Sequence, residues 1–164
     1  MIRSIIFLLS FLCSLSVFAT EQIDDLFSIE RIDYSISELP LSQLYSPNQL
    51  FEIIHPQMCT ASRRGYQANW RLRGDYLWLD SIRKNPCDPN YESIESTLLF
   101  KNKNYPIKAD WFTGSISLPV GEFKYKYGKD VDDLLGYEVD VFEFVFSKGK
   151  LVSKGMRVDS KSYK

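Results

Sequence analysis

The sequence predicts a mainly β domain, with a curved antiparallel sheet that closes toward a barrel or a sandwich and with one short helix. Apolar and polar residues alternate in several short stretches, as they do in half-buried strands. Turn-forming Gly, Pro, Asn and Asp residues separate these stretches. Aromatic residues make up 15% of the chain, which supplies many rings for the core of a small β domain.

The first part of the predicted domain contains a strand and a helix. Apolar and polar residues alternate over 32–36, which predicts a strand. Ser46 followed by Pro47 is typical of a helix N-terminus, and Pro56 is typical of a helix end. We therefore expect a short helix over about 47–55, with its apolar residues on one side.

The clearest hairpin joins residues 68–73 to residues 76–80. Trp and Leu alternate with Asn and Arg in its first strand, and Gly74-Asp75 can form a two-residue reversal. Arg73-Gly74-Asp75 also spells the tripeptide that integrins bind. We interpret it as turn chemistry, because a three-residue match in a predicted turn has little specificity.

The next stretches predict three further strands. Residues 94–100 are a plausible strand, and residues 115–120 and 123–127 alternate between apolar and polar. Proline cannot donate a hydrogen bond to a strand ladder. Pro119 therefore places its strand at an edge of the sheet or at its own end.

Residues 137–146 predict another strand, with an irregularity in its middle. The apolar set changes phase between Val141 and Phe142. Since a β-bulge produces such a change, we predict one at this point. A turn at 148–149 then leads into a final strand over 151–158, which completes a terminal hairpin.

The first 19 residues predict a cleavable secretory signal peptide. Arg3 precedes an apolar run, and Val17-Phe18-Ala19 precedes polar residues, which is the pattern that signal peptidase reads. The uncharged run of about 14 residues is shorter than the ~20 needed to span a bilayer, so a retained membrane anchor is the less favoured alternative. We predict a signal peptide over 1–19 and a single β-rich domain over 20–164. We also expect a periplasmic or secreted protein without a stable membrane span once the signal is removed.

The cysteines predict one disulfide. Cys13 follows Leu12, where lipid-modified exported proteins have a small residue, so we expect it to leave with the signal. Cys59 and Cys87 remain, and an even pair in an oxidising compartment most simply forms one bridge. Two separate buried thiols are the alternative. Redox catalysis is disfavoured, because the chain has no C-x-x-C spacing.

The charge balance argues against nucleic acid as a partner. The chain has 20 basic and 21 acidic residues and a net charge of −1. Basic residues nevertheless gather around the first hairpin and acidic residues later in the chain: Arg63, Arg64, Arg71, Arg73, Arg83 and Lys84, and Asp130, Asp132, Asp133, Glu138, Asp140 and Glu143. We interpret these clusters as two solvated faces. A charged recognition patch is the alternative.

Residue types that carry chemistry are sparse. His55 is the only histidine, which excludes sites that need two imidazoles. Asp130, Asp132 and Asp133 lack the glycine and the final glutamate of a calcium-binding EF-hand loop. The sequence has no phosphate-binding glycine loop, no G-x-S-x-G elbow and no H-E-x-x-H helix. We expect no metal and no cofactor, and we consider an enzyme less favoured than a binding protein.

Two segments resemble a group of small uncharacterised exported bacterial proteins. The shared pattern is R-G-Y-x-A-x-W followed by A-D-W-F-T-G-x-I-x-x-P-x-G, found here over 64–70 and 109–121. It covers about the middle third of the mature chain, and A-D-W-F-T-G is its most specific part. The resemblance implies a bacterial origin and a β-rich fold, and it implies no activity. The chain departs from the pattern after Gly121, where it continues into residues 123–128.

Three functions are compatible with these observations. The first is a non-catalytic periplasmic protein that recognises another protein, in the manner of an immunity or inhibitor protein, with Arg71, Arg73, Trp78 and Trp111 as candidate binding residues. The second is a carrier of a small apolar or envelope ligand inside a β-barrel lined by aromatic rings. The third is an enzyme that acts on envelope polymers, which requires His55 or two carboxylates in a pocket.

Overall fold

The computed structural model describes residues 20–130 and 133–163, so the predicted signal peptide lies outside the described part. The elements, in chain order, are β1 (Asp25–Ile29), β2 (Ile32–Ile36), the 3-10 helix η1 (Pro40–Gln43), α2 (Pro47–Ile54), β3 (Tyr66–Arg73), β4 (Tyr76–Lys84), β5 (Glu92–Ser93), α3 (Ser96–Leu99), β6 (Ile107–Lys108), β7 (Gly114–Pro119), β8 (Lys124–Tyr127), β9 (Leu134–Ser147) and β10 (Lys150–Ser162). The mainly β class is confirmed. No helix among these residues is long and apolar enough to cross a membrane.

One sheet contains all the strands, in the order β2-β1-β3-β4-β10-β9-β7. β5 and β6 add to β4, and β8 adds to β9. The expectation of an antiparallel sheet needs one correction, because β1 pairs with β3 in parallel. Parallel neighbours need a long crossover between them, and here η1 and α2 form it.

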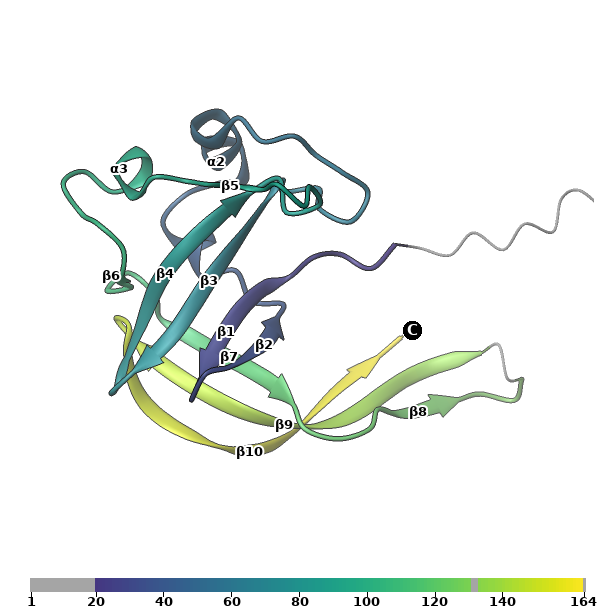
Figure 1. The fold of residues 1–164 in the computed structure, drawn as a ribbon. Helices are drawn as coiled ribbons and strands as arrows, with labels where there is room; N and C mark the ends of the chain where they lie inside the picture. Colours follow the sequence, from purple (N-terminus) through teal and green to yellow (C-terminus); the bar gives the residue numbers. More distant parts are fainter. Residues whose placement is uncertain (1–19, 131–132, 164) are drawn as a thin grey trace, which may run out of the picture.

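The sheet is strongly curved, so that its two halves face each other (Figure 1). One half contains β1 to β4, and the other contains β7, β9 and β10. The halves meet where Lys150 pairs with Tyr76. At the opposite ends of the sheet, β2 and β7 lie in contact without a ladder, and the Ser117 N–H donates to the Glu38 carboxylate over 3.0 Å. The sheet is therefore open, and the barrel form of the prediction is not realised.

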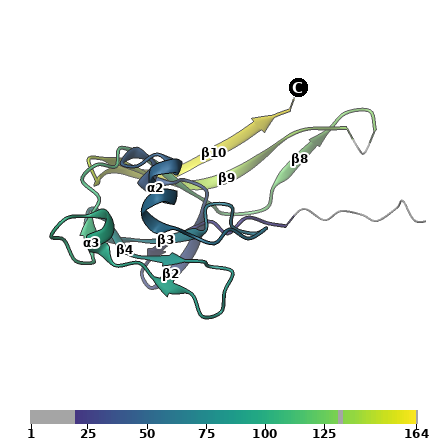
Figure 2. The same cartoon turned by 90° about the horizontal axis from the view of Figure 1, so that it is seen from above.

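Aromatic rings from both halves form the core between them. The Phe27 ring of β1 meets the Phe144 and Phe146 rings of β9 edge-on, at centroid distances of 5.4 and 6.5 Å. Trp70 of β3 is fully buried beside them in the same cluster. Seen from above, α2 lies between the two half-sheets, where Leu50 and Ile54 pack into one end of the core (Figure 2).

The predicted helix over 47–55 is confirmed as α2. The Ser46 hydroxyl accepts a hydrogen bond from the Gln49 backbone, and the Gln49 side chain accepts one from the Ser46 backbone. Pro47 occupies the first turn, where its missing N–H costs nothing. His55 ends the helix in the left-handed conformation, at φ 48°.

Two expectations about local structure are wrong. Residues 94–100 do not form a strand, because α3 occupies most of this range and only Glu92 and Ser93 pair with β4. The segment has no strict alternation, and its apolar residues fit a helical turn as well as a strand, so periodicity alone could not separate the two. β9 also has no bulge at Val141 and Phe142, since its pairing with β10 is regular there.

The phase change in β9 has another cause. Val139 and Val141 are buried on one face of the strand, whereas Phe144 and Phe146 are buried on the other face, in the core. The buried face of β9 therefore changes along the strand, from one side at Val139 and Val141 to the opposite side at Phe144 and Phe146. The bulge in this hairpin lies on β10, between Leu151 and Ser153.

The disulfide between Cys59 and Cys87 is confirmed. It joins the loop after α2 to the loop after β4. It thereby ties the long crossover between β1 and β3 to the β3–β4 hairpin.

Candidate functional site

Three of the four predicted binding residues lie together on the outer face of the β3–β4 hairpin. Arg71 stands opposite Trp78 in the register, and Arg73 stands opposite Tyr76. Lys108 of β6 pairs with Trp78, so it lies on the same face. The two-residue turn predicted between these strands is also present. The structure thus places cations and rings together, as the sequence suggested.

The arginines of this face are already paired within the chain. Asp80 Oδ2 lies 2.7 Å from Arg71 Nε, and its Oδ1 lies 3.0 Å from Arg73 Nη2. A bulge in β4 puts the carboxylate there, because Asn69 pairs with Ser81 while Trp70 pairs with Leu79. Since a partner would have to compete with Asp80 for both guanidiniums, this face is a weaker interface than the sequence predicts.

The fourth residue, Trp111, does not join this face. Its indole Nε1 donates to the Pro40 carbonyl over 3.1 Å, and its ring stacks on Phe100 at 5.2 Å. The same ring meets Trp70 edge-on at 6.4 Å. Trp111 therefore anchors η1 against the core, and the A-D-W-F-T-G segment that contains it has a packing role.

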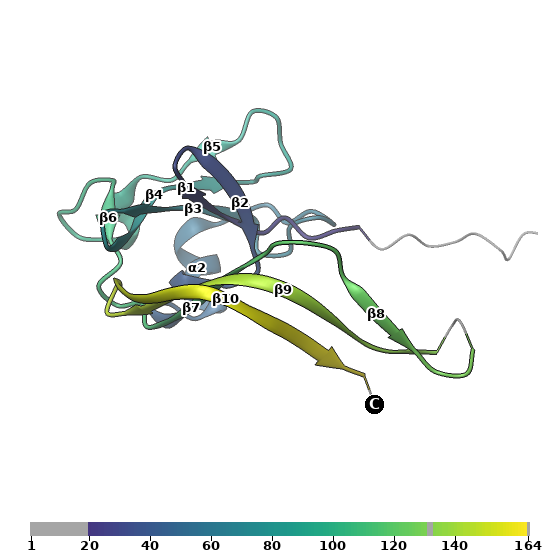
Figure 3. The ribbon, with the colours of Figure 1, turned by 90° about the horizontal axis from the view of Figure 1, so that it is seen from below.

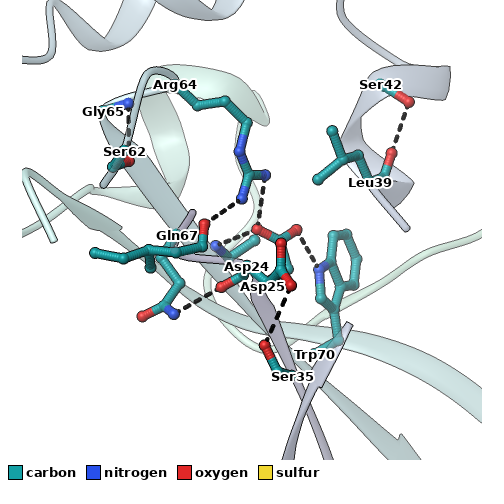
Figure 4. A network of polar contacts seen from close by, with 12 residues as sticks. Asp24, Asp25, Ser35, Leu39, Ser42, Ser62, Arg64, Gly65, Gln67 and Trp70 are labelled. Carbon is teal, nitrogen blue, oxygen red and sulfur yellow. Dashed lines mark hydrogen bonds and ion pairs between the residues drawn. The ribbon is translucent and has the colours of Figure 1, made fainter. Parts of the chain in front are cut away.

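The R-G-Y-x-A-x-W segment also has a structural role, which centres on Asp25 (Figure 4). The fully buried Asp25 carboxylate accepts hydrogen bonds from Arg64 Nη1 at 2.9 Å, the Ala68 backbone at 3.1 Å and Trp70 Nε1 at 3.0 Å. Arg64 also donates to the Ile23 carbonyl and lies 5.0 Å from the Tyr66 ring centroid. These contacts join β1 to β3.

Asp25 is buried, as many catalytic carboxylates are, but its surroundings are not those of a catalytic site. Desolvation raises the pKa of Asp25 above its ordinary value, against the Arg64 charge and the hydrogen bonds that favour the carboxylate. Both carboxylate oxygens are engaged by the chain itself. The site therefore stabilises the fold and offers no open position to a substrate.

The remaining candidates for chemistry are dispersed. His55 is exposed at the end of α2. Asp130 and Asp133 belong to a turn, in which the Asp133 N–H donates to the Asp130 carbonyl, and Asp132 lies outside the described residues. Across residues 20–130 and 133–163, no group of three or more His, Cys, Asp or Glu is placed to hold a metal ion.

One polar hollow brings carboxylates together, at the junction of β2, β7 and β10. Arg157 there contacts Glu143 and Asp159, each at 2.9 Å. Glu38 accepts the Ser117 N–H with one oxygen, and its other oxygen is buried without a partner among the described residues. Burial raises the pKa of Glu38. Arg157 thus pairs with two of the carboxylates near the hollow, and Glu38 keeps one buried oxygen without a partner among the described residues.

Sequence reasoning missed a different surface, which we call the arm. It consists of β8, residues 134–140 of β9, residues 158–162 of β10 and Tyr163, which follows β10. Figures 1 and 3 show it projecting from the rest of the molecule, which we call the body. β8 pairs with β9 over the arm's length, and β9 pairs with β10.

Exposed apolar and aromatic side chains concentrate on the arm and the strands that lead into it. Together they hold more than half of the exposed large apolar side chains found within residues 20–130 and 133–163. They are Val120, Phe123, Tyr125, Tyr127, Leu134, Leu135, Val152, Met156, Val158 and Tyr163. A concentration of exposed apolar side chains of this kind on a small domain indicates an interaction site.

The rings of this region lie against one another. Phe123 stacks on Tyr125 at 6.1 Å and meets Tyr137 edge-on at 5.2 Å. Tyr125 contacts Tyr127, and Tyr137 contacts Tyr163, both at 6.4 Å. The cluster covers one face of the arm and is open to solvent, since Tyr125 and Tyr127 are 53% and 52% exposed.

Beside the arm, the core of the body opens to solvent through a gap that we call the mouth. Along β2 the inward side chains grow steadily more exposed, from Ile36 at 1% through Tyr34 at 36% to Ile32 at 57%. The end of β7 shows the same trend, since Leu118 is buried and Val120, just after the strand, is exposed. The mouth is a hollow of about 400 Å³ with mainly apolar walls: Ile29, Tyr34, Leu72, Leu118, Val120, Phe142 and Phe144, with Glu30 and Lys154 at its rim.

A second apolar hollow lies at the other end of β3, under α2. It measures about 340 Å³ and is lined by Leu39, Tyr45, Pro47, Leu50, Phe51 and Tyr66, with Arg63 and Arg64 among its polar residues. The Arg64 guanidinium is held by Asp25. The hollow is large enough for a small apolar molecule.

Comparisons with known proteins identify no relative. No protein-family model matches the chain, and no curated protein or solved structure matches it significantly. The resemblance to exported bacterial proteins therefore remains an expectation.

Proposed function

We propose that this chain is an exported, non-catalytic protein that recognises another protein through its arm and mouth. The observation that carries the proposal is the concentration of exposed rings and aliphatic side chains on the arm and the strands that lead into it. Aromatic residues and methionine are enriched in protein interfaces and dominate their binding energy. The arm presents exposed tyrosines, and the exposed Met156 precedes the arm on β10.

The packing of the rings favours binding over a purely structural role. Phe123, Tyr125 and Tyr137 hold one another in place by ring contacts. A tyrosine has few rotatable bonds, and one that is already held loses little conformational entropy when a partner covers it. The tyrosine hydroxyls can also bond polar groups at the rim of an interface.

Export is the second part of the proposal. The leader pattern over 1–19 matches a signal peptide, and the bridge between Cys59 and Cys87 suits an oxidising compartment. Cell fractionation with intact-mass measurement tests it. We expect a periplasmic or secreted species that lacks the leader and whose two cysteines resist alkylation until they are reduced. A full-length cytosolic species with free thiols contradicts export.

A double substitution on the arm tests partner recognition. The variant Tyr125→Ser with Tyr127→Ser removes two exposed rings, and Tyr91→Ser with Leu98→Ser removes comparable exposed side chains from the body. Tagged proteins expressed in the native host are cross-linked, captured and identified by mass spectrometry. We expect a specific partner to be lost about tenfold or more from the arm variant and retained by the body variant, as for loss of interface anchors.

Equal recovery of every cross-linked protein by both variants contradicts recognition through the arm. Circular dichroism of both variants checks that each is folded. Partner loss from the body variant alone also contradicts the proposal.

The apolar hollow under α2 favours a second candidate function, the carriage of a small apolar ligand. It has the volume and the lining of a small-molecule site. Native mass spectrometry of protein purified from its host tests this alternative. A retained small molecule that is lost from Leu50→Arg supports carriage. A single species at the mass of the polypeptide argues against it.

A further inference from the structure

The second strand of the terminal hairpin, β10, has a long edge without a partner. It pairs with β9 from Lys150 to Ser162, but with β4 only at Lys150. The Leu151 N–H still reaches the Asp75 carbonyl, and the body then diverges from the strand. Within the described chain, no strand pairs with the outer edge of β10 beyond that point.

The direction of the backbone groups on β10 follows from two hydrogen bonds. The Tyr163 N–H donates to the Leu135 carbonyl, so Tyr163 and Leu135 form a hydrogen-bonded pair in the antiparallel ladder. The Val120 N–H donates to the Asp140 carbonyl, which turns the backbone of Asp140 toward β7 and away from Val158. Because the pattern alternates along the strand, the N–H and C=O groups of Lys154, Met156, Val158 and Ser160 point outward.

The same residues carry the side chains that flank the mouth. Met156 pairs with Phe142, so it stands on the face that continues into the core, and Val158 follows two residues later. Both side chains are 60% exposed. Lys154 is at the rim of the mouth itself. An unpaired backbone edge and an open apolar hollow therefore lie side by side.

We propose that the partner contributes an extended, acidic segment that adds to β10 as a further strand and places alternate apolar side chains over the mouth. This inference rests on the proposed function and specifies its binding mode. Backbone pairing supplies affinity in strand addition, and the pockets for alternate side chains supply specificity. The outward groups of β10 and the mouth provide both.

The charge of the outer edge of β10 indicates which kind of strand can pair with it. Lys150, Lys154 and Lys161 of β10 form no ion pair with any carboxylate of the described residues, whereas Arg157 is held by Glu143 and Asp159. A second copy of β10 would bring further lysines to the same edge, and such charges protect edge strands from pairing with their own copies. An acidic strand is not repelled in this way, because the same lysines attract its carboxylates.

Synthetic peptides test the proposal with the whole mature protein. The probe is a nine-residue peptide that alternates valine with glutamate. One control alternates valine with lysine, and a second is the acidic peptide with N-methyl groups on alternate amides. Binding is followed by ¹⁵N NMR and by amide hydrogen exchange. We expect the acidic peptide alone to bind and to slow exchange at Met156, Val158 and Ser160.

Two variants separate the backbone contribution from the charge. Ser160→Pro removes one outward N–H without removing a bond to β9, and Ser160→Ala is its matched control. Lys154→Glu reverses the charge at the mouth. We expect Ser160→Pro and Lys154→Glu each to weaken the acidic peptide about tenfold, and Ser160→Ala to leave its affinity unchanged.

Equal binding of the acidic and basic peptides, no slowing of exchange at the outward amides, or a dimer that forms through β10 overturns the inference. These outcomes leave the proposed function in place if a cross-linked partner still depends on Tyr125 and Tyr127. Loss of that dependence overturns the proposed function instead.

Discussion

The body and the arm place their aromatic residues differently. In the body, Phe27 and Trp70 are fully buried, and three donors satisfy the Asp25 carboxylate. In the arm, Tyr125 and Tyr127 are half exposed and rest mainly on neighbouring rings. Both regions use aromatic residues at close spacing. In the body these rings exclude water from a core shared by two half-sheets, whereas within the described chain the arm is a single layer of strands (Figure 3).

This difference separates stability from recognition. A ring that is buried between two layers contributes several kcal/mol to folding, whereas a ring on an open face contributes little until something covers it. The free energy of unfolding should therefore be sensitive to substitutions in the body and insensitive to those in the arm. On the proposed function, the exposed rings of the arm serve binding rather than stability.

The largest expected effect comes from the buried ion pair of the body. Arg64→Ala leaves the Asp25 carboxylate buried without its charged partner, and we expect the free energy of unfolding to fall by about 3–5 kcal/mol. Arg63→Ala is the neighbouring control, with an exposed side chain and an expected change within about 0.5 kcal/mol. Urea unfolding measures both, and equal effects would show that the network does not stabilise the body.

Removal of the disulfide should cause the second-largest loss in the free energy of unfolding. Replacing Cys59 and Cys87 together by serine opens a loop that joins the crossover to the central hairpin, and we expect a loss of about 2–4 kcal/mol. The variant should still bind arm-dependent partners at temperatures where it is folded, because the bridge lies in the body. Thermal unfolding with and without reductant measures the loss. Binding that fails in the folded variant would contradict the separation of body and arm.

Two tryptophans of the body sharpen the comparison. Trp111→Phe removes the hydrogen bond to the Pro40 carbonyl and part of the stack on Phe100, at an expected cost of about 1–2 kcal/mol. Trp78 Nε1 is buried without a partner in the described chain, so we expect Trp78→Phe to change stability by less than about 0.5 kcal/mol. Chemical unfolding distinguishes them, and a larger loss from Trp78→Phe would reverse our assignment.

The arm itself should tolerate substitution. We expect the double variant Tyr125→Ser with Tyr127→Ser to unfold within about 0.5–1 kcal/mol of the unmodified protein, because neither ring is buried. Differential scanning calorimetry provides the measurement. A loss comparable with that from Arg64→Ala would mean that the arm is part of the folding core.

The smallest effect concerns pH at the junction of β2 and β7. Because burial raises the pKa of Glu38, the folded state holds this proton more tightly than the unfolded chain, and the group's contribution to stability is lost as the pH rises through the folded pKa. Glu38→Gln removes that part of the pH dependence. We expect the variant to gain stability relative to the unmodified protein as the pH rises above the ordinary pKa of a glutamate, measured by urea unfolding. A gain confined to acid pH would reverse the sign that we assign.

The strands with clear alternation were predictable from sequence. β2, β3, β7 and β8 follow the period of two, β4 and β10 follow from the turns that precede them, and α2 follows its capping residues. β1 was missed because its first inward residue is the charged Asp25, although Asp25, Phe27 and Ile29 are in phase. That in-phase carboxylate was a signal of a buried ion pair, but its partners lie about 40 residues away and no local pattern identifies them.

The candidate surfaces were predictable only in part. The register that brings Arg71 and Arg73 to one face follows from alternation, but the bulge that inserts Asp80 between them depends on the pairing of the strands. The arm was visible as a tyrosine-rich strand over 123–127, and it was assigned to the core because rings are usually buried. Whether a second layer covers a strand is decided by tertiary structure.

The ring contacts of Phe27 have a consequence for synthesis. Phe27 lies in the first strand of the described chain, and its partners Phe144 and Phe146 lie in the next-to-last strand. A polypeptide leaves the ribosome from its N-terminus, so the segment that completes the hydrophobic interior is translated almost last. Chains halted before that segment have no means of closing their interior, and we expect this protein to acquire its native structure only after translation is nearly complete.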